Sequence, residues 1–237
     1  MRDALYISIG QEEQLVITSD NSGSVGMREQ DTVKVPYKTV SFYSFRVAIM
    51  ECMASGAKPI SVVIQNFCGN EAWDEIASGV RKGLSELDME NVPITGSTES
   101  NFSLSQSAMG LIVIGKRSIL SSMEQNDLQH QNVALIGLPL VGDEVVSQAD
   151  MIAPLSIFKE ICGVRGVTVW PVGSKGVLHE LERMFPGFDK NRVTSSSKVD
   201  LIKSGGPSTS FLVAYPFRLE RRIIEIAEKH FNKLIVG

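Results

Sequence analysis

Acid-and-glycine turns at the ends of apolar segments constrain this chain more than any other sequence feature. Each of three segments sets an acid beside glycines: Asp20 in Ser19–Gly26, Glu51 ahead of Gly56, and Glu99 in Gly96–Ser100. The segments before Asp20 and Glu99 are short and rich in β-branched residues, which favours strands. Carboxylates bind magnesium, and glycines let backbone N–H groups approach phosphate oxygens. The pattern predicts an α/β chain with a magnesium-bound phosphate at its strand ends.

The composition is that of a globular protein. The chain has 237 residues, 43% hydrophobic and 21% charged, with a formal net charge of −4. The charge indicates no nucleic-acid partner, and the apolar runs are too short to span a membrane. The N-terminus shows no secretory signal. The three scattered cysteines are typical of reduced thiols, so we expect a cytoplasmic protein.

Short strands and helices alternate along the chain. In the first half the expected strands are Leu5–Ile9, Leu15–Thr18, Ser61–Gln65, Val92–Thr95 and Met109–Ile114, and the expected helices are Phe42–Met53 and Glu71–Leu87. In the second half the expected strands are Val133–Ile136, Val167–Val172 and Phe211–Tyr215, and the helices are Lys175–Phe185 and Arg218–Phe231. A polar stretch separates the halves. It predicts a domain over 1–118, a connector over 119–132 and a second domain over 133–237.

Two common nucleotide-binding motifs are excluded. Gly110–Lys116 has the letters of a P-loop, but aliphatic strand formers fill its centre and Arg117 follows where a P-loop has Ser or Thr. No dinucleotide-binding glycine fingerprint follows a strand. The three histidines have no zinc-site spacing.

Each acid also has a structural interpretation. Asp20 is a candidate turn cap, Glu51 a candidate partner of Lys58 or Arg46 in a buried salt bridge, and Glu99 a polar loop residue. Three such acids in one domain favour a shared magnesium and phosphate site. The second half adds the glycine turns Gly173–Gly176 and Ser204–Thr209, whose amides are candidates for anion contacts or for tight turns alone.

The pattern resembles the family of aminoimidazole ribonucleotide synthetase, selenophosphate synthetase, thiamine-monophosphate kinase and hydrogenase maturation factor. Its most specific match is Val47–Pro59, similar to a family helix that carries an acid and ends in Ala-Met-Gly-Ala-x-Pro. The turn at Asp20 looks like the family's first magnesium acid, and Gly96–Glu99 like its Gly-Gly-acid-Thr turn. Ser174–Leu178 and Gly205–Ser208 are similar to Ser-Asp-Gly-Gly-Leu and Gly-Gly-Glu-Asp segments of the family.

Several family acids are replaced. Glu51 stands for an aspartate, Lys175 for an acid, and Pro207 and Ser208 for two more. Fewer acids imply fewer magnesium ions, or ions held differently. The short, acid-depleted form looks most like α-ribazole kinase, which phosphorylates the ribose 5′-hydroxyl of a cobalamin lower-ligand nucleoside.

The resemblance implies a two-domain aminoimidazole ribonucleotide synthetase-like fold, whose N-terminal sheets pair into a barrel in a homodimer. It implies ATP and Mg²⁺ as cofactors and a nucleoside-like substrate. Asp20 and Glu51 are the implied catalytic residues, and Asp20, Glu51 and Glu99 the implied metal ligands. The implied ATP-binding residues are Asn21, Gly23, Gly56, Gly96, Ser97, Thr98, Lys175, Gly205 and Gly206. Two alternatives remain: an ATP-dependent synthetase or ligase acting on a ribonucleotide, and a non-catalytic nucleotide-binding assembly protein.

Overall fold

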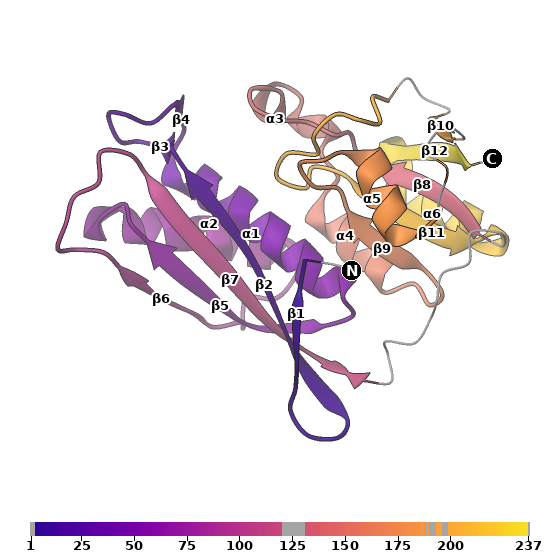
Figure 1. Cartoon of the computed structure of the whole chain (residues 1–237), viewed down its shortest axis with the longest axis horizontal. Coiled ribbons are helices and arrows are strands. Elements are labelled where there is room, and N and C mark those ends of the chain that lie inside the picture. The colour runs from indigo at the N-terminus through magenta and orange to yellow at the C-terminus, as the bar shows by residue number, and fades with distance from the viewer. Residues whose placement is uncertain (1–2, 120–130, 188, 190–192, 196–198, 237) are drawn as a thin grey trace. The chain divides into compact units, whose positions relative to one another are not determined.

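The chain forms two compact units, each built on one five-stranded sheet. The computed structural model describes residues 3–119, 131–187, 189, 193–195 and 199–236 (Figure 1). Of the described residues, 3–119 belong to one unit and those from 131 onward to the other. Both combine helices with a sheet, so the predicted α/β class is confirmed. Residues 120–130 of the predicted connector lie outside the described residues.

The first sheet has the strand order β1-β2-β7-β5-β6. Its strands are β1 (Leu5–Ser8), β2 (Glu13–Gly23), β5 (Lys58–Asn66), β6 (Ile94–Thr98) and β7 (Ala108–Ser118). β7 pairs antiparallel with β2 and β5, and β5 pairs parallel with β6. β2, β5 and β6 therefore end at the same edge, at Gly23, Asn66 and Thr98; we call this the strand-end edge. The excluded P-loop match, Gly110–Lys116, lies inside β7, which confirms its exclusion.

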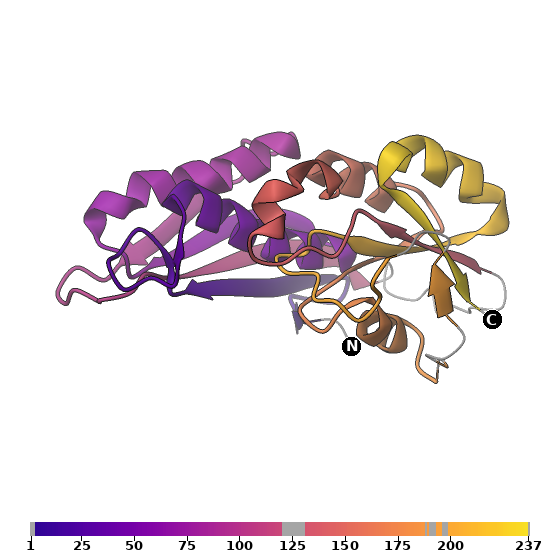
Figure 2. The same cartoon turned by 90° about the horizontal axis from the view of Figure 1, so that it is seen from above.

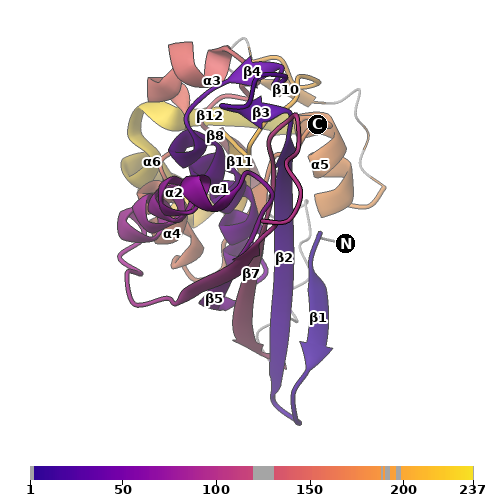
Figure 3. The same ribbon diagram turned by 90° about the vertical axis from the view of Figure 1, so that its left-hand side faces the viewer.

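Helices cover one face of this sheet (Figures 2 and 3). Helix α1 (Tyr37–Ala54) packs on β2, β7 and β5, and α2 (Trp73–Glu86) packs on α1 after a short 3₁₀ turn, η1 (Asn70–Ala72). The expected helix over Glu71–Leu87 is confirmed in α2, whose apolar residues Ile76, Val80 and Leu84 recur every four positions and are buried. A two-stranded parallel pair, β3 (Val25–Gly26) with β4 (Val33–Lys34), holds the segment that follows β2.

The opposite face of the first sheet carries aliphatic side chains that no described element of its unit covers. Strand pairing and alternation place the following residues on this side, which we call the open face: Leu5, Ile7, Leu15, Ile17, Val63, Ile112 and Ile114. Leu5 and Ile7 are exposed and the others half-buried. An apolar sheet face of this extent favours a partner surface.

The contact between α1 and α2 depends on Gly79. A Cβ atom at this position would overlap the carbonyl oxygen of Lys38 and the hydroxyl of Ser41 in α1. We expect Gly79→Ala to lower the free energy of unfolding by about 1–3 kcal/mol, although alanine favours helices, because the helices must move apart. Chemical denaturation measures this change. Ser78→Ala in the same helix is the control; an equal loss in both variants would contradict the close approach.

The second sheet has the strand order β10-β12-β8-β11-β9, and its described pairings are antiparallel. Its strands are β8 (Gln131–Ile136), β9 (Thr168–Pro171), β10 (Val193–Ser195), β11 (Phe211–Pro216) and β12 (Phe231–Val236). Helix α5 (Val177–Met184) packs on one face, and α4 (Leu155–Cys162) and α6 (Glu220–Ala227) lie on the other (Figure 2). Short helical turns are α3 (Glu144–Ser147), η4 (Ala149–Met151), η6 (Phe217–Leu219) and η7 (Glu228–His230). Phe158 of α4 meets Phe211 edge-on, with ring centroids 5.0 Å apart.

The last expected helix is shorter than predicted. The sequence predicted Arg218–Phe231, but α6 ends at Ala227 and β12 follows from Phe231. Glu228 has a φ of +48°, which ends the helical path, and alternating Lys233, Leu234 and Ile235 complete the sheet beside β8. Among the described residues no helix is long and apolar enough to cross a membrane.

Candidate functional site at the strand-end edge

Asp20 is a partly buried carboxylate between β2 and α1. Its side chain hydrogen-bonds to Ser44 of α1, and Thr18, two residues earlier on the same side of β2, donates its hydroxyl to the carbonyl of Ala48 at 2.7 Å. Burial raises the pKa of Asp20 to about 6, and the bonds from Ser44 and the backbone of Asn21 only partly oppose that rise. Carboxylates whose pKa is raised by burial occur often at functional sites.

The predicted turn at Asp20 is wrong. β2 continues to Gly23, and Asp20 pairs with Leu111 of β7 inside the ladder. This polar stretch can form a strand because its side chains alternate between the helix-covered face and the exposed face of the sheet. Asp20 meets α1, while Asn21 is exposed on the other side. The turn predicted at Gly96–Thr98 is also wrong, because these residues belong to β6, which ends at Thr98. Glu99 is the first residue beyond the strand.

A network of hydrogen bonds fixes the loops at the strand-end edge, beyond the end of β2. Asp31 accepts bonds from the backbone and the hydroxyl of Ser107, both at 2.6 Å, and from the amide of Arg28 at 2.8 Å. Burial alone would raise the pKa of Asp31, but these bonds and the charge of Lys34 lower it overall. No sequence pattern predicts this role, because Asp31 stands in an ordinary polar stretch.

Arg28 joins three loops of this edge. Its guanidinium donates to the carbonyl of Leu104 and to the carbonyl of Cys68, each at 2.8 Å. Tyr37, at the start of α1, lies with its hydroxyl 3.1 Å from that of Ser107. The strand-end edge is therefore a built surface in which the positions of loops and helix start are fixed.

Glu99 lies at the same edge with a local structural role. One oxygen of its carboxylate accepts the amides of Asn101 at 2.7 Å and Phe102 at 3.2 Å. Its own amide donates to Asn66, whose side chain in turn donates to Thr98. These contacts match the loop interpretation of Glu99, and the second carboxylate oxygen has no bond to another described residue.

Glu51 and Gly56 lie toward the opposite end of the unit. α1 runs against the direction of β2, because Ser44 meets Asp20 and Ala48 meets Thr18. Glu51 is seven residues beyond Ser44, or about 10 Å along the helix. Gly56, with a φ of +75°, follows the C-terminus of α1, and its amide donates to the carbonyl of Met53. Its position is explained by helix capping.

The three predicted acids do not converge within one copy. Strand register aligns Asp20 with Leu111, Ile64 and then Gly96, so Asp20 is three strand spacings, about 14 Å, from β6. Glu99 lies three residues beyond Gly96. Among the described residues no three His, Cys, Asp or Glu side chains are placed to hold a metal ion together. A role for Glu51 or Glu99 as a metal ligand stays a prediction.

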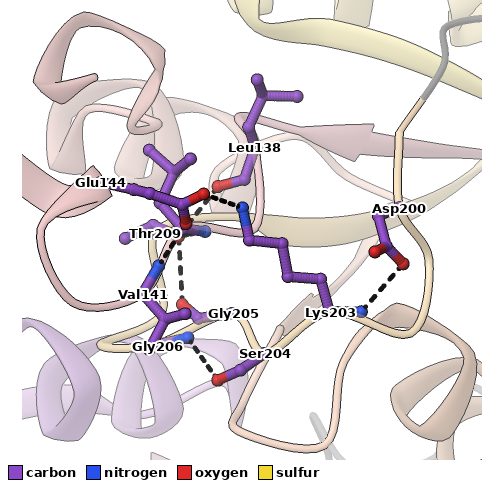
Figure 4. Close-up of polar contacts among 10 residues, drawn as sticks. Leu138, Val141, Glu144, Asp200, Lys203, Ser204, Gly205, Gly206 and Thr209 are labelled. Atoms are coloured by element: carbon purple, nitrogen blue, oxygen red, sulfur yellow. Dashed lines mark hydrogen bonds and ion pairs between the residues drawn. The ribbon is translucent and has the colours of Figure 1, made fainter. Parts of the chain in front are cut away.

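The predicted glycine turns of the second unit meet at one end of its sheet. Figure 4 shows Ser204, Gly205 and Gly206 of the second turn. The segment before β11 lies against the ends of β8 and β9. The Gly205 amide donates to the carbonyl of Gly173 at 2.9 Å, and the Gly206 amide to the hydroxyl of Ser204 at 3.0 Å. Gly206 has a φ of +49°, and a Cβ there would overlap the carbonyl oxygen of Leu140. These two amides serve loop packing in this conformation, while Lys175 is exposed.

An ion pair that the sequence analysis missed lies beside these turns. The Lys203 ammonium is 2.6 Å from the Glu144 carboxylate, which also accepts the amide of Val141 at 3.2 Å (Figure 4). The bond from Lys203 lowers the pKa of Glu144. Lys203 and Glu144 are 59 residues apart in the chain, so no local pattern could pair them.

Thr209 fixes the same loops from within. Its buried hydroxyl accepts the amide of Leu140 at 2.9 Å and lies 2.8 Å from the carbonyl of Leu138. We expect Thr209→Val, which keeps the shape, to lower the free energy of unfolding by about 1–3 kcal/mol, because buried polar groups lose their partner. Thermal unfolding measures the loss. Thr194→Val, on the half-exposed strand β10, is the control, and a Thr209→Val variant as stable as wild type would refute this role.

Comparison with known proteins supports the fold. No family model and no curated protein matches the chain. Among solved structures, PurL of Thermotoga maritima in complex with AMPPCP is similar over 98% of this chain, with 14% identity and a TM-score of 0.64; the chain spans 41% of PurL. Thiamine-monophosphate kinases of Aquifex aeolicus and Stenotrophomonas maltophilia are similar over 99% of this chain and 89% of theirs, each with 13% identity, at TM-scores of 0.64 and 0.60. These matches show that the chain shares the fold of PurL and of thiamine-monophosphate kinase, as the sequence predicted for the latter.

Proposed function

Because the chain has the fold of these ATP-binding and phosphate-handling proteins, we propose that it is an ATP-dependent phosphotransferase. The observation that carries the proposal is the likeness across nearly the whole chain to thiamine-monophosphate kinase and to PurL in complexes with AMPPCP, ATP and ADP. The chain covers 89% of the kinase, so the kinase comparison includes nearly all of that protein.

Asp20 is the residue to which the proposal gives the central role. Mg²⁺ in phosphoryl-transfer sites is held by one or two carboxylates together with water and substrate phosphates, so a single Asp20 fits this need. Bound Mg²⁺ would neutralise charge on the transferred phosphate. Glu99 is on the same edge but has a turn to cap, and Glu51 is about two helical turns away. Asp20 is thus the best placed of the three.

The chain's own residues have two further tasks in this proposal. The acceptor hydroxyl attacks the terminal phosphorus of ATP, a new O–P bond forms, ADP leaves, and the hydroxyl proton passes to a base or to solvent. Asp20 is mostly ionised at pH 8, as a magnesium ligand must be, because that pH lies above its pKa of about 6. Ser44 orients that carboxylate. The loops fixed by Arg28 and Asp31 hold the strand-end edge in one conformation.

The finer proposal names α-ribazole as the acceptor and its 5′-phosphate as the product. It rests on the acid-depleted motifs at Glu51, Lys175 and Pro207 rather than on any contact. The test is incubation of the protein with ATP, Mg²⁺ and α-ribazole, followed by mass spectrometry. Thiamine monophosphate is the comparison acceptor. Phosphorylation of α-ribazole alone supports the finer proposal, while phosphorylation of thiamine monophosphate alone replaces it with the other kinase.

An ATP-dependent synthetase is the second candidate. The similarity to PurL, including its complex with FGAR, favours this candidate. The two classes differ in products, because a synthetase releases inorganic phosphate and a kinase leaves the phosphate on the acceptor. Measurement of free phosphate beside ADP in the same reaction separates them. ATP binding without turnover on any acceptor would favour a non-catalytic role.

The proposal includes a homodimer formed through the open face. An apolar sheet face is stable when another surface buries it, and the open face of a second copy is a surface of matching shape. β1 is an edge strand, and pairing of its backbone with a partner would also remove an exposed edge. The open face and the helix-covered face carry different residues, so dimerisation leaves Asp20 in contact with α1.

A further inference from the structure

A hollow of about 780 Å³ lies at the end of the second sheet opposite to the glycine turns. The start of α6 and the turn η6 form one side, and Asn132 and Lys233 of the sheet form the other. The glycine turns precede Phe211, whereas the hollow follows Pro216, so the six residues of β11, about 20 Å, separate the two. The hollow is therefore a different place from the site proposed above.

Most charges around the hollow are already paired. The Glu220 carboxylate accepts bonds from the Lys233 ammonium at 2.8 and 3.0 Å and from the amide of Asn132. Arg221 pairs with Glu225 one helical turn later, at 2.9 Å. The two acids that line the hollow are thus each paired with one cation. The third cation of the lining is Arg218.

Arg218 is exposed and has no hydrogen bond or ion pair to any other described residue. Its neighbour Phe217 has 64% of its surface exposed, and Ile224, one turn into α6, has 42% exposed. An exposed aromatic ring and an exposed aliphatic side chain thus line the same hollow as an unpaired guanidinium. Apolar side chains beside an unpaired cation can hold the two halves of a ligand that has both an apolar and an anionic part.

We propose that this hollow binds a small aromatic carboxylate. The planar guanidinium of Arg218 pairs with a carboxylate through two parallel hydrogen bonds, which a phenolic or neutral group cannot reproduce. An aromatic ring stacks on Phe217 and packs against Ile224. The volume lies within the range of small-molecule sites. One negative charge on the ligand balances the one unpaired cation.

The test uses 2-naphthoate as the probe on the full-length protein, followed by isothermal titration calorimetry and by amide shifts in NMR spectra. We expect saturable binding with shifts at η6 and the start of α6, and at least about ten-fold weaker binding of the neutral 2-naphthamide. Equal affinity for the acid and the amide would overturn the role of Arg218. The absence of saturation at millimolar concentration would overturn the site itself.

Variants locate the binding. Arg218→Gln should weaken 2-naphthoate about ten-fold while leaving the weak binding of the amide unchanged, and Phe217→Ser should weaken both. Arg222→Gln is the matched control, because Arg222 lies on α6 but pairs with Glu160 at 3.0 Å and does not line the hollow. Both target residues are exposed, so their loss leaves the fold intact, and unchanged melting temperatures verify this. Equal weakening in the Arg222→Gln variant would contradict the proposal.

Discussion

The Asp20→Asn variant is expected to be more stable than the wild type at pH 8 and, under the proposed function, to be inactive in phosphoryl transfer. Burial raises the pKa of Asp20 from its ordinary 3.8 to about 6. The wild type therefore ionises a partly buried group above pH 6, which costs free energy. Asparagine keeps the shape and still accepts the bond from Ser44, but it carries no charge.

The sign of the pH dependence follows from the raised pKa. The folded protein binds the proton more tightly than the unfolded chain, so the contribution of Asp20 is fully present below about pH 4 and is lost as the pH rises through 6. This rise in pKa corresponds to about 3 kcal/mol at most, and partial exposure reduces this to about 1–2 kcal/mol. The advantage of Asp20→Asn should appear above pH 5 and vanish near pH 4.

Thermal unfolding between pH 4 and 8, with EDTA to remove metal ions, measures this effect. Asp74→Asn is the control, because Asp74 is an exposed acid in the first turn of α2 and its loss brings no gain. Added Mg²⁺ and ATP should stabilise the wild type and not the Asp20→Asn variant. If the variant is less stable than the wild type at pH 8, the account of Asp20 as a strained functional acid is wrong.

The second large effect is expected at the open face. Ile17 lies at its centre, opposite Leu5 of β1 and Ile114 of β7. We expect the wild type to be a dimer and Ile17→Lys to be a folded monomer. A lysine there is solvated in the monomer but loses its water in the dimer, which weakens association about a hundred-fold or more.

Sedimentation velocity over a range of concentrations measures this change. Circular dichroism verifies that the variant is folded. Arg81→Glu reverses a charge on the outer side of α2 and should leave the dimer unchanged. A wild type that remains monomeric at about 100 μM would refute the dimer, as would an Ile17→Lys protein that associates normally.

Local sequence patterns predicted where helices and strands lie better than they predicted the contacts between them. The four-residue spacing of Ile76, Val80 and Leu84 is a local pattern, and it is sufficient to predict α2. The same reasoning stopped β2 at Thr18, because Ser19–Gly23 is polar and glycine-containing. Tertiary contacts override that preference, since β7 pairs with β2 up to Gly23.

Asp20 is a candidate that the sequence singled out, and its role in a site stays a prediction. Its hydrogen-bond partner Ser44 and the network around Asp31 had no sequence signal. Ser107, which holds Asp31, is 76 residues away in the chain, and such pairings depend on the fold. Glu51 and Glu99 were grouped with Asp20 by composition, yet strand register and helix direction separate them.

Transfer of the terminal phosphate of ATP tests the central claim most directly. The protein, ATP labelled with ¹⁸O in its γ-phosphate, Mg²⁺ and α-ribazole are incubated together, and the products are followed by mass spectrometry. The account predicts one labelled phosphate on the nucleoside for each ADP formed, and loss of both products in Asp20→Asn. ATP binding with no labelled acceptor, or equal turnover in the variant, would contradict it.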